Sequence, residues 1–167
     1  MEKEITEVYC GNGRGKTTLA IGQALRASSQ GKSVIIIQFL KGNERRELDF
    51  LEELDQLDIK IFRFEKMESC YDQLNEEEQA EEERNILNGL NFARKVIATQ
   101  ECDFLVLDEI LGLLDKHIAT VDMVVGLLKQ KDESLHLILT GNRVDPGILD
   151  YVDSVTTITT LGREQNS

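Results

Sequence analysis

Apolar and polar positions along the chain follow two different patterns, and the switches between them predict its secondary structure. Short segments that are continuously apolar, or alternate with a period of two, predict β-strands. Longer segments whose apolar residues recur every three or four positions predict helices. The strand pattern covers residues 4–10, 33–40, 59–64, 103–109, 135–141 and 154–161. The helix pattern covers residues 16–31, 43–57 and 120–131, and in the second of these Leu48, Leu51 and Leu54 are expected to face inward. A further helix begins at Asn75, with an apolar stripe of Ile86, Leu90, Ala93 and Ile97. A short helix follows Asp145, which caps it.

Strands alternate with helices along the whole sequence, without an internal repeat, a linker or a low-complexity segment. We therefore expect one domain over residues 1–167 with an α/β fold. Such alternation predicts a mostly parallel sheet with right-handed crossovers and helices on both faces. Ligands of these sheets bind at the carboxyl ends of the strands, so the residues that follow each predicted strand are the candidates for chemistry.

A glycine-rich segment, "CGNGRGKTT" (10–18), joins the first predicted strand to the first predicted helix. It ends like the phosphate-binding pattern G-x-x-x-x-G-K-[ST], but Cys10 stands where that pattern has its first glycine. Glycines at every second position let backbone N–H groups converge on phosphate oxygens, and the following helix adds its positive dipole end. We predict that a nucleoside triphosphate binds to Gly11, Asn12, Gly13, Arg14, Gly15, Lys16, Thr17 and Thr18.

The segment "FLVLDE" (104–109) supplies the carboxylates that such a loop needs for a metal ion. Its buried strand delivers Asp108 and Glu109 at the carboxyl end, where an acidic residue holds magnesium directly or through water. The Thr17 hydroxyl is the third predicted magnesium ligand. Glu109 is also a candidate to polarise an attacking water in an ATPase.

Two further strands end in polar residues at the same predicted edge, in "QFLKG" (38–42) and "LTGNR" (139–143). Lys41 and Arg143 are candidates to bind phosphate there. An exposed basic residue in an ordinary turn is the alternative for each.

The net charge and the lengths of the apolar runs exclude some classes of binding partner. The net charge is −12, from 19 basic and 31 acidic residues, so a polyanion such as DNA or RNA is repelled. The acidic run "NEEEQAEEER" (75–84) is interpreted as the solvated start of a helix. No apolar run is long enough to span a membrane, and the first residues resemble no leader peptide.

Cysteine and histidine usage favours neither disulfides nor a zinc site. The three cysteines, Cys10, Cys70 and Cys102, form no C-x-x-C pair, which indicates a reducing cytoplasm and small core residues. Cys10 is set apart by its place beside the phosphate loop, where a helix terminus can activate a thiol. His117 and His136 lack partners at metal-ligand spacing, so a structural or surface role is expected.

The motifs together resemble a known family. "GNGRGKTTLAIGQALRA", "GKSVIIIQFLKG", "LVLDEI", "LTG" and "DYVDSVTTI" follow one another in the order found in the P-loop corrinoid adenosyltransferases of cobalamin metabolism. The loop of that family reads closely as G-N-G-K-G-K-T-T and likewise begins one residue late. The resemblance runs from about residue 5 to residue 158.

The resemblance implies a RecA-like fold and transfer of the 5′-deoxyadenosyl group from ATP to the cobalt of a reduced corrinoid, with release of triphosphate. It implies that Lys16 and Glu109 are catalytic, that Thr17, Asp108 and Glu109 hold magnesium, and that Arg26 reaches the ribose. It also implies a homodimer and a corrinoid reductase as partner.

The chain departs from the family pattern in the segment that helps to handle the corrinoid. Where the family carries Phe-Thr-Trp, this sequence has "EKMESCYDQL" (65–74), with Tyr71 as the candidate replacement, and it contains no tryptophan. The family Thr-Gly-Arg appears with its arginine one place late, at Arg143. Two alternatives therefore stay open: a P-loop ATPase or nucleoside kinase-like enzyme, and a non-catalytic ATP-binding module.

Overall fold

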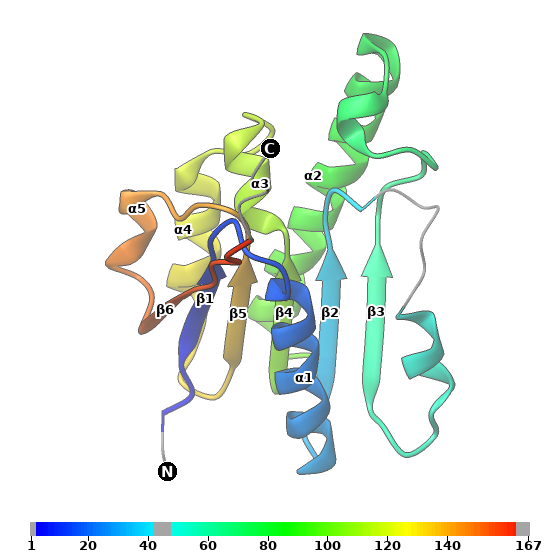
Figure 1. The fold of residues 1–167 in the computed structure, drawn as a ribbon. Helices are drawn as coiled ribbons and strands as arrows, with labels where there is room; N and C mark the ends of the chain where they lie inside the picture. The colour runs from blue at the N-terminus through cyan, green and yellow to red at the C-terminus, as the bar shows by residue number, and fades with distance from the viewer. Residues whose placement is uncertain (1–2, 42–47, 163–167) are drawn as a thin grey trace.

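The computed structural model describes residues 3–41 and 48–162 and contains one six-stranded sheet (Figure 1). All of its strand pairs are parallel, and the strand order is β3-β2-β4-β5-β1-β6. The strands are β1 (Thr6–Cys10), β2 (Val34–Gln38), β3 (Ile59–Arg63), β4 (Phe104–Asp108), β5 (His136–Thr140) and β6 (Ser154–Thr157). The predicted α/β fold is confirmed. Because all strands point the same way, their carboxyl ends meet along a single edge.

Helices cover both faces of the sheet, as predicted. Helix α1 (Lys16–Ser29) and the 3₁₀ helix η1 (Asp49–Glu53) pack on one face. The other face carries α2 (Glu76–Thr99), α3 (Ile110–Asp115), α4 (Val121–Gln130) and α5 (Pro146–Leu149). A short 3₁₀ helix, η2 (Tyr71–Gln73), precedes α2. The continuously apolar strands β2 and β4 are buried along their whole length because each lies between two layers of helices.

The starts of two helices follow from side-chain caps that the sequence predicts. Asn75 accepts a hydrogen bond from the backbone N–H of Glu78, and the Glu78 carboxylate accepts one from the N–H of Asn75, which completes a capping box. Asp145 caps α5 through the N–H of Gly147. These caps fix where α2 and α5 begin.

Three features of the fold differ from the sequence-based expectations. Of the predicted helix 43–57, residues 43–47 lie outside the described residues, and the remainder forms only η1, with Leu54 exposed. Helix α3 was not predicted, because six residues are too few to establish a helical period. The last strand is shorter than the predicted 154–161 and ends at Thr157.

The acidic run at the start of α2 is solvated except for Glu82, whose side chain is buried. Its carboxylate accepts hydrogen bonds from the backbone N–H groups of Lys66 and Met67 and from the side-chain amide of Asn85. Glu82 thus fixes the position of the segment that follows β3. The sequence pattern does not distinguish this buried residue from the acidic residues around it.

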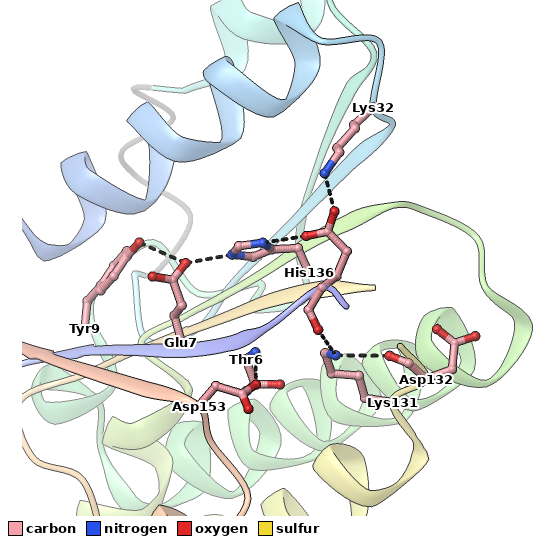
Figure 2. A network of polar contacts seen from close by, with 9 residues as sticks. Thr6, Glu7, Tyr9, Lys32, Lys131, Asp132, His136 and Asp153 are labelled. Carbon is pink, nitrogen blue, oxygen red and sulfur yellow. Dashed lines mark hydrogen bonds and ion pairs between the residues drawn. The ribbon is translucent and has the colours of Figure 1, made fainter. Parts of the chain in front are cut away.

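A network of polar side chains, which we name the amino-end network, connects the amino ends of β1 and β5 at the edge opposite the phosphate loop (Figure 2). The two ring nitrogens of His136 lie 3.1 Å and 2.7 Å from carboxylate oxygens of Glu4 and Glu7, and Lys32 donates to Glu4 at 2.5 Å. The ring of His136 stacks on Phe104. The expected structural role of His136 is therefore supported.

Within the part of the chain that the structure describes, no helix is both long and apolar enough to cross a membrane.

Candidate active site

The predicted phosphate loop lies between β1 and α1, at the carboxyl edge of the sheet (Figure 1). Gly15 adopts φ 101°, a left-handed conformation that glycine enters without a Cβ penalty, and it immediately precedes the first turn of α1. The buried Lys16 ammonium donates to the carbonyls of Gly11 at 2.7 Å and Gly13 at 3.0 Å. The loop carbonyls thus surround the lysine ammonium, and these hydrogen bonds stabilise the loop conformation.

The segment that continues β6 crosses directly over this loop and explains two of its glycines. A Cβ atom on Gly11 or Gly13 would lie 2.3 Å or 2.6 Å from the carbonyl oxygen of Ile158. That carbonyl accepts the Gly13 N–H at 2.9 Å, and the Thr160 hydroxyl accepts the Arg14 N–H at 2.8 Å. We name residues 158–160 the strap.

Cys10, at the position of the missing glycine, is the buried last residue of β1 and pairs with Thr157 of β6. Its sulfur lies 3.7 Å from the Thr157 hydroxyl. The strand therefore continues to the position where the usual loop has its first glycine, and a side chain fits there.

Hydrogen-bond donors remain available at the start of α1. The first intrahelical bond runs from the N–H of Leu19 to the carbonyl of Gly15, and no side chain caps the helix. The N–H groups of Lys16, Thr17 and Thr18 therefore point out of the first turn, where a helix dipole favours an anion. Thr18 is exposed and lines the adjacent cleft.

Asp108 is the centre of the polar contacts at this edge, and its side chain is 0% exposed. One carboxylate oxygen accepts hydrogen bonds from the hydroxyls of Thr17 at 2.9 Å and Thr140 at 2.7 Å. The other oxygen accepts from the Gln38 amide at 3.2 Å and lies 3.9 Å from the Lys41 ammonium. The structure thus joins three sequence candidates, Thr17, Lys41 and Asp108, which come from separate elements.

Glu109 follows at the N-terminus of α3, in a left-handed conformation with φ 63°. Burial raises the pKa of its carboxyl group, and the neighbouring Asp108 acts in the same direction, whereas Lys41 and Lys16 oppose the shift. A carboxylate destabilised in this way gains from a nearby cation.

The other predicted binding residues lie farther out. Asn12 and Arg14 are exposed on the loop, and Arg143 is exposed on the segment after β5, where it donates to Asp115 at 3.1 Å. Arg26 lies in the last turn of α1, about 15 Å along the helix from Lys16. The structure does not bring Arg26 or Arg143 into the group around Asp108.

A cleft of about 660 Å³ opens beside the loop, large enough for a small-molecule ligand. It lies between α1, the ends of β2 and β3, and the segment before η2. Its walls consist of Thr17, Thr18, Ile21, Gln38, Leu40, Lys41, Leu48, Arg63, Glu68, Cys70 and Gln73. The phosphate loop and a substrate-sized cleft are thus continuous.

The sequence matches a known protein family. The family model of the ATP:corrinoid adenosyltransferases BtuR/CobO/CobP matches residues 2–165, almost the entire sequence. The chain belongs to this family.

Curated relatives support the assignment over nearly the same length. The corrinoid adenosyltransferase of Escherichia coli (strain K12) is 30% identical over 160 residues, which cover 93% of this chain and 76% of the relative. The corrinoid adenosyltransferase CobA of Salmonella typhimurium is 28% identical over 158 residues, with the same coverage of both chains.

Among solved structures, the KaiC-like protein PH0186 from Pyrococcus horikoshii OT3 has a similar fold. It superposes with a TM-score of 0.62 at 19% identity, over 93% of this chain and 71% of that one. This likeness confirms the RecA-like fold.

In this adenosyltransferase family member, the segment in place of Phe-Thr-Trp borders the cleft through Glu68, Cys70 and Gln73. Tyr71 is directed elsewhere: its hydroxyl donates to Glu83 at 2.5 Å, and its ring packs against the core. Cys70 is exposed, so the expectation that all three cysteines are core residues is wrong for this one. Its exposure follows from its place in the irregular segment before η2.

Proposed function

We propose that this protein transfers the 5′-deoxyadenosyl group of ATP to the cobalt of a reduced corrinoid. In this reaction the Co(I) electron pair forms the cobalt–carbon bond at C5′ of the ribose. The C5′–oxygen bond breaks, and its electron pair leaves with the triphosphate. The nucleophile belongs to the corrinoid substrate, so the tasks of the protein are binding, orientation and charge stabilisation.

The observation that carries this proposal is the hydrogen bond between the Thr17 hydroxyl and the Asp108 carboxylate beside the phosphate loop, in a chain that belongs to this family. Because the Thr17 hydroxyl donates a hydrogen bond to Asp108, its lone pairs remain for a metal ion. The N–H groups at the start of α1 lie next to this hydroxyl. A triphosphate on those donors would have its oxygens within reach of the same metal.

The residues present fit magnesium. Magnesium is held in such sites by one or two carboxylates, substrate phosphates and waters rather than by a cage of protein ligands. Such a cage is not found among the described residues, which include no group of three or more His, Cys, Asp and Glu side chains that could hold a metal. Thr17, Asp108 and Glu109 would hold the ion, which supplies positive charge at the triphosphate.

Lys16 is proposed to stabilise the charge that develops on the leaving triphosphate. Its ammonium lies against the loop carbonyls, close to the donors at the start of α1. Lys41, which lies 3.9 Å from Asp108 and lines the cleft, is proposed to add a second cation, and Arg143 is proposed to contact phosphate from the segment after β5. Arg26 is proposed to bind ribose. The corrinoid is proposed to enter the cleft over Cys70 and Gln73.

The test is an anaerobic assay with ATP, magnesium and chemically reduced cob(I)alamin, followed by the visible spectrum and by analysis of the phosphate products. We expect adenosylcobalamin and intact triphosphate. Formation of ADP and phosphate without a spectral change would overturn the proposal in favour of an ATPase or kinase. ATP binding without any turnover would overturn it in favour of a binding module.

The family resemblance supports two further proposals about assembly and environment. We expect a homodimer, which light scattering of the purified protein tests. The three cysteines are free, which fits a reducing cytoplasm, where a corrinoid reductase would supply the Co(I) substrate.

A further inference from the structure

The hydroxyl of Thr140 contacts both acidic residues of the candidate site. It donates to the Asp108 carboxylate at 2.7 Å and accepts the backbone N–H of Glu109 at 2.8 Å. The side chain is 0% exposed, at the carboxyl end of β5. We propose that Thr140 is a positioning residue that holds Asp108 and Glu109 in the arrangement that binds magnesium. This inference rests on the proposed use of magnesium and ATP.

Strand order explains why this role falls to β5. The phosphate loop follows β1, the acidic pair lies at the end of β4, and β5 lies between these strands and pairs with both. The last residue of β5 therefore lies beside the end of β4, where its hydroxyl reaches both Asp108 and Glu109. Gly141, the next residue, is confined as well, since a Cβ there would lie 2.4 Å from the Cβ of Leu111.

The contact with Asp108 fixes the orientation of a buried carboxylate. The oxygen that accepts a hydrogen bond from Thr140 also accepts one from Thr17. Without the Thr140 hydroxyl, Thr17 alone would donate to this oxygen, while Gln38 and Lys41 would stay beside the other oxygen. The orientation of the carboxylate, and with it the direction in which Thr17 offers its lone pairs to a metal, would then be held less tightly.

The contact with Glu109 fixes a backbone conformation that is uncommon for a residue other than glycine. The φ of 63° sets the direction in which the Glu109 side chain leaves the chain. Its carboxylate lies over Gly112, where an added Cβ would be 3.2 Å from an Oε atom. The N–H bond to Thr140 holds this turn in place. Because its hydroxyl is fully buried and both contacts are internal, Thr140 acts through Asp108 and Glu109 and not on the substrate.

The test compares Thr140→Val, which keeps the shape and removes the hydroxyl, with Thr140→Ser, which keeps the hydroxyl. Calorimetric titration with ATP at a series of magnesium concentrations measures the apparent magnesium affinity, and titration in EDTA measures metal-free ATP binding. We expect Thr140→Val to weaken magnesium binding about 10- to 100-fold, as loss of a group that orients a metal ligand does, with metal-free ATP binding unchanged. Thr140→Ser should behave as the wild type.

Thr6→Val is the matched control, since Thr6 is a buried threonine at the opposite end of β1. It should leave the magnesium dependence unchanged. The inference is overturned if Thr140→Val retains wild-type magnesium dependence, if metal-free ATP binding falls equally, or if Thr140→Ser is as impaired as Thr140→Val. Should Thr140→Val not fold, Thr140→Cys, with its weakly hydrogen-bonding thiol, is judged by the same criteria.

The calorimetry also separates this inference from the proposed reaction. If the wild type binds ATP in a magnesium-dependent way but forms no adenosylcobalamin, the proposed reaction fails, and the variants still decide the role of Thr140. If the wild type does not bind ATP, both are overturned.

Discussion

Lys16 illustrates how one residue serves both the loop and its proposed ligand. Its ammonium donates to two loop carbonyls and is buried, so its removal takes a charge from the nucleotide site and two bonds from the loop. We expect Lys16→Ala to lower ATP affinity by about 10- to 100-fold, the value of one or two charge-assisted hydrogen bonds. Calorimetry measures this, with the exposed Lys95→Ala as control. Unchanged affinity would contradict the assignment of the loop.

Glu109 opposes stability and serves the proposed function at the same position. Because burial raises its pKa, the folded state favours the protonated form, and the contribution of this group to stability is lost as the pH rises through the folded value. At a pH above the folded pKa, the ionised carboxylate therefore destabilises the protein. We expect Glu109→Gln to melt at an equal or higher temperature than the wild type and to lose magnesium-dependent turnover by about 100-fold.

Thermal melts at pH 7 in EDTA, together with initial rates over a range of magnesium concentrations, check both parts of this prediction. The exposed Glu133→Gln is the control for a neutralised carboxylate. A lower melting temperature or wild-type turnover would show that Glu109 is a structural residue.

At the scale of elements, the strap forms hydrogen bonds with the loop that is proposed to bind the nucleotide. The strap engages the N–H groups of Gly13 and Arg14, which are among the donors that a phosphate loop offers to phosphate. We expect Thr160→Val, which releases the Arg14 N–H, to bind ATP about two- to tenfold more tightly, because a neutral hydrogen bond contributes about 0.5–1.5 kcal/mol.

Thr159→Val is the control next to it, on an exposed threonine for which the structure gives no bond to the loop. Calorimetric ATP titrations of both variants make the comparison. Equal or weaker binding by Thr160→Val would mean that the strap supports the loop instead of competing for its donors.

Most elements could be predicted because each carries a local signal. Strands β2 and β4 are continuously apolar, and α2 begins with a capping box and continues with an apolar stripe. The described part of the predicted helix 43–57 fails because its apolar spacing places Leu54 in solvent and buries only Leu51 fully. A helical period shows which residues could share a face, not whether a neighbour exists to cover that face.

At the scale of the whole molecule, the sequence predicts which residues form the candidate site, but it does not predict which of them are in contact. Asp108 ends a strand, Lys41 comes shortly after one, and Lys16 and Thr17 lie in the first turn of the helix that follows β1, so their shared edge could be predicted. The position of β5 between β1 and β4 could not, because strand order is set by packing of distant segments. The contacts of Thr140 and of the strap with residues far away in sequence depend on that order.

The amino-end network predicts how the whole molecule responds to acid (Figure 2). The hydrogen bond from Lys32 holds the pKa of Glu4 below its usual value of 4.5, with a smaller contribution from His136 in the same direction and burial opposing. A depressed carboxylate pKa contributes stability above the unfolded-state value, and this contribution is lost as the pH falls through the folded value. We expect Glu4→Gln to lower the free energy of unfolding by up to about 1 kcal/mol at neutral pH, since the pair is partly exposed.

Urea unfolding of wild type and Glu4→Gln between pH 7 and pH 3 measures this difference, which should stay constant down to about pH 5 and close below the usual carboxyl pKa. Glu133→Gln is the control, because its pair with Lys3 spans 3.9 Å and both side chains are mostly exposed. That variant should differ little from the wild type at any pH. A Glu4→Gln difference that persists at pH 3 would mean that the amide disturbs packing around His136, and that the charge of Glu4 is not what joins the first strand to the fifth.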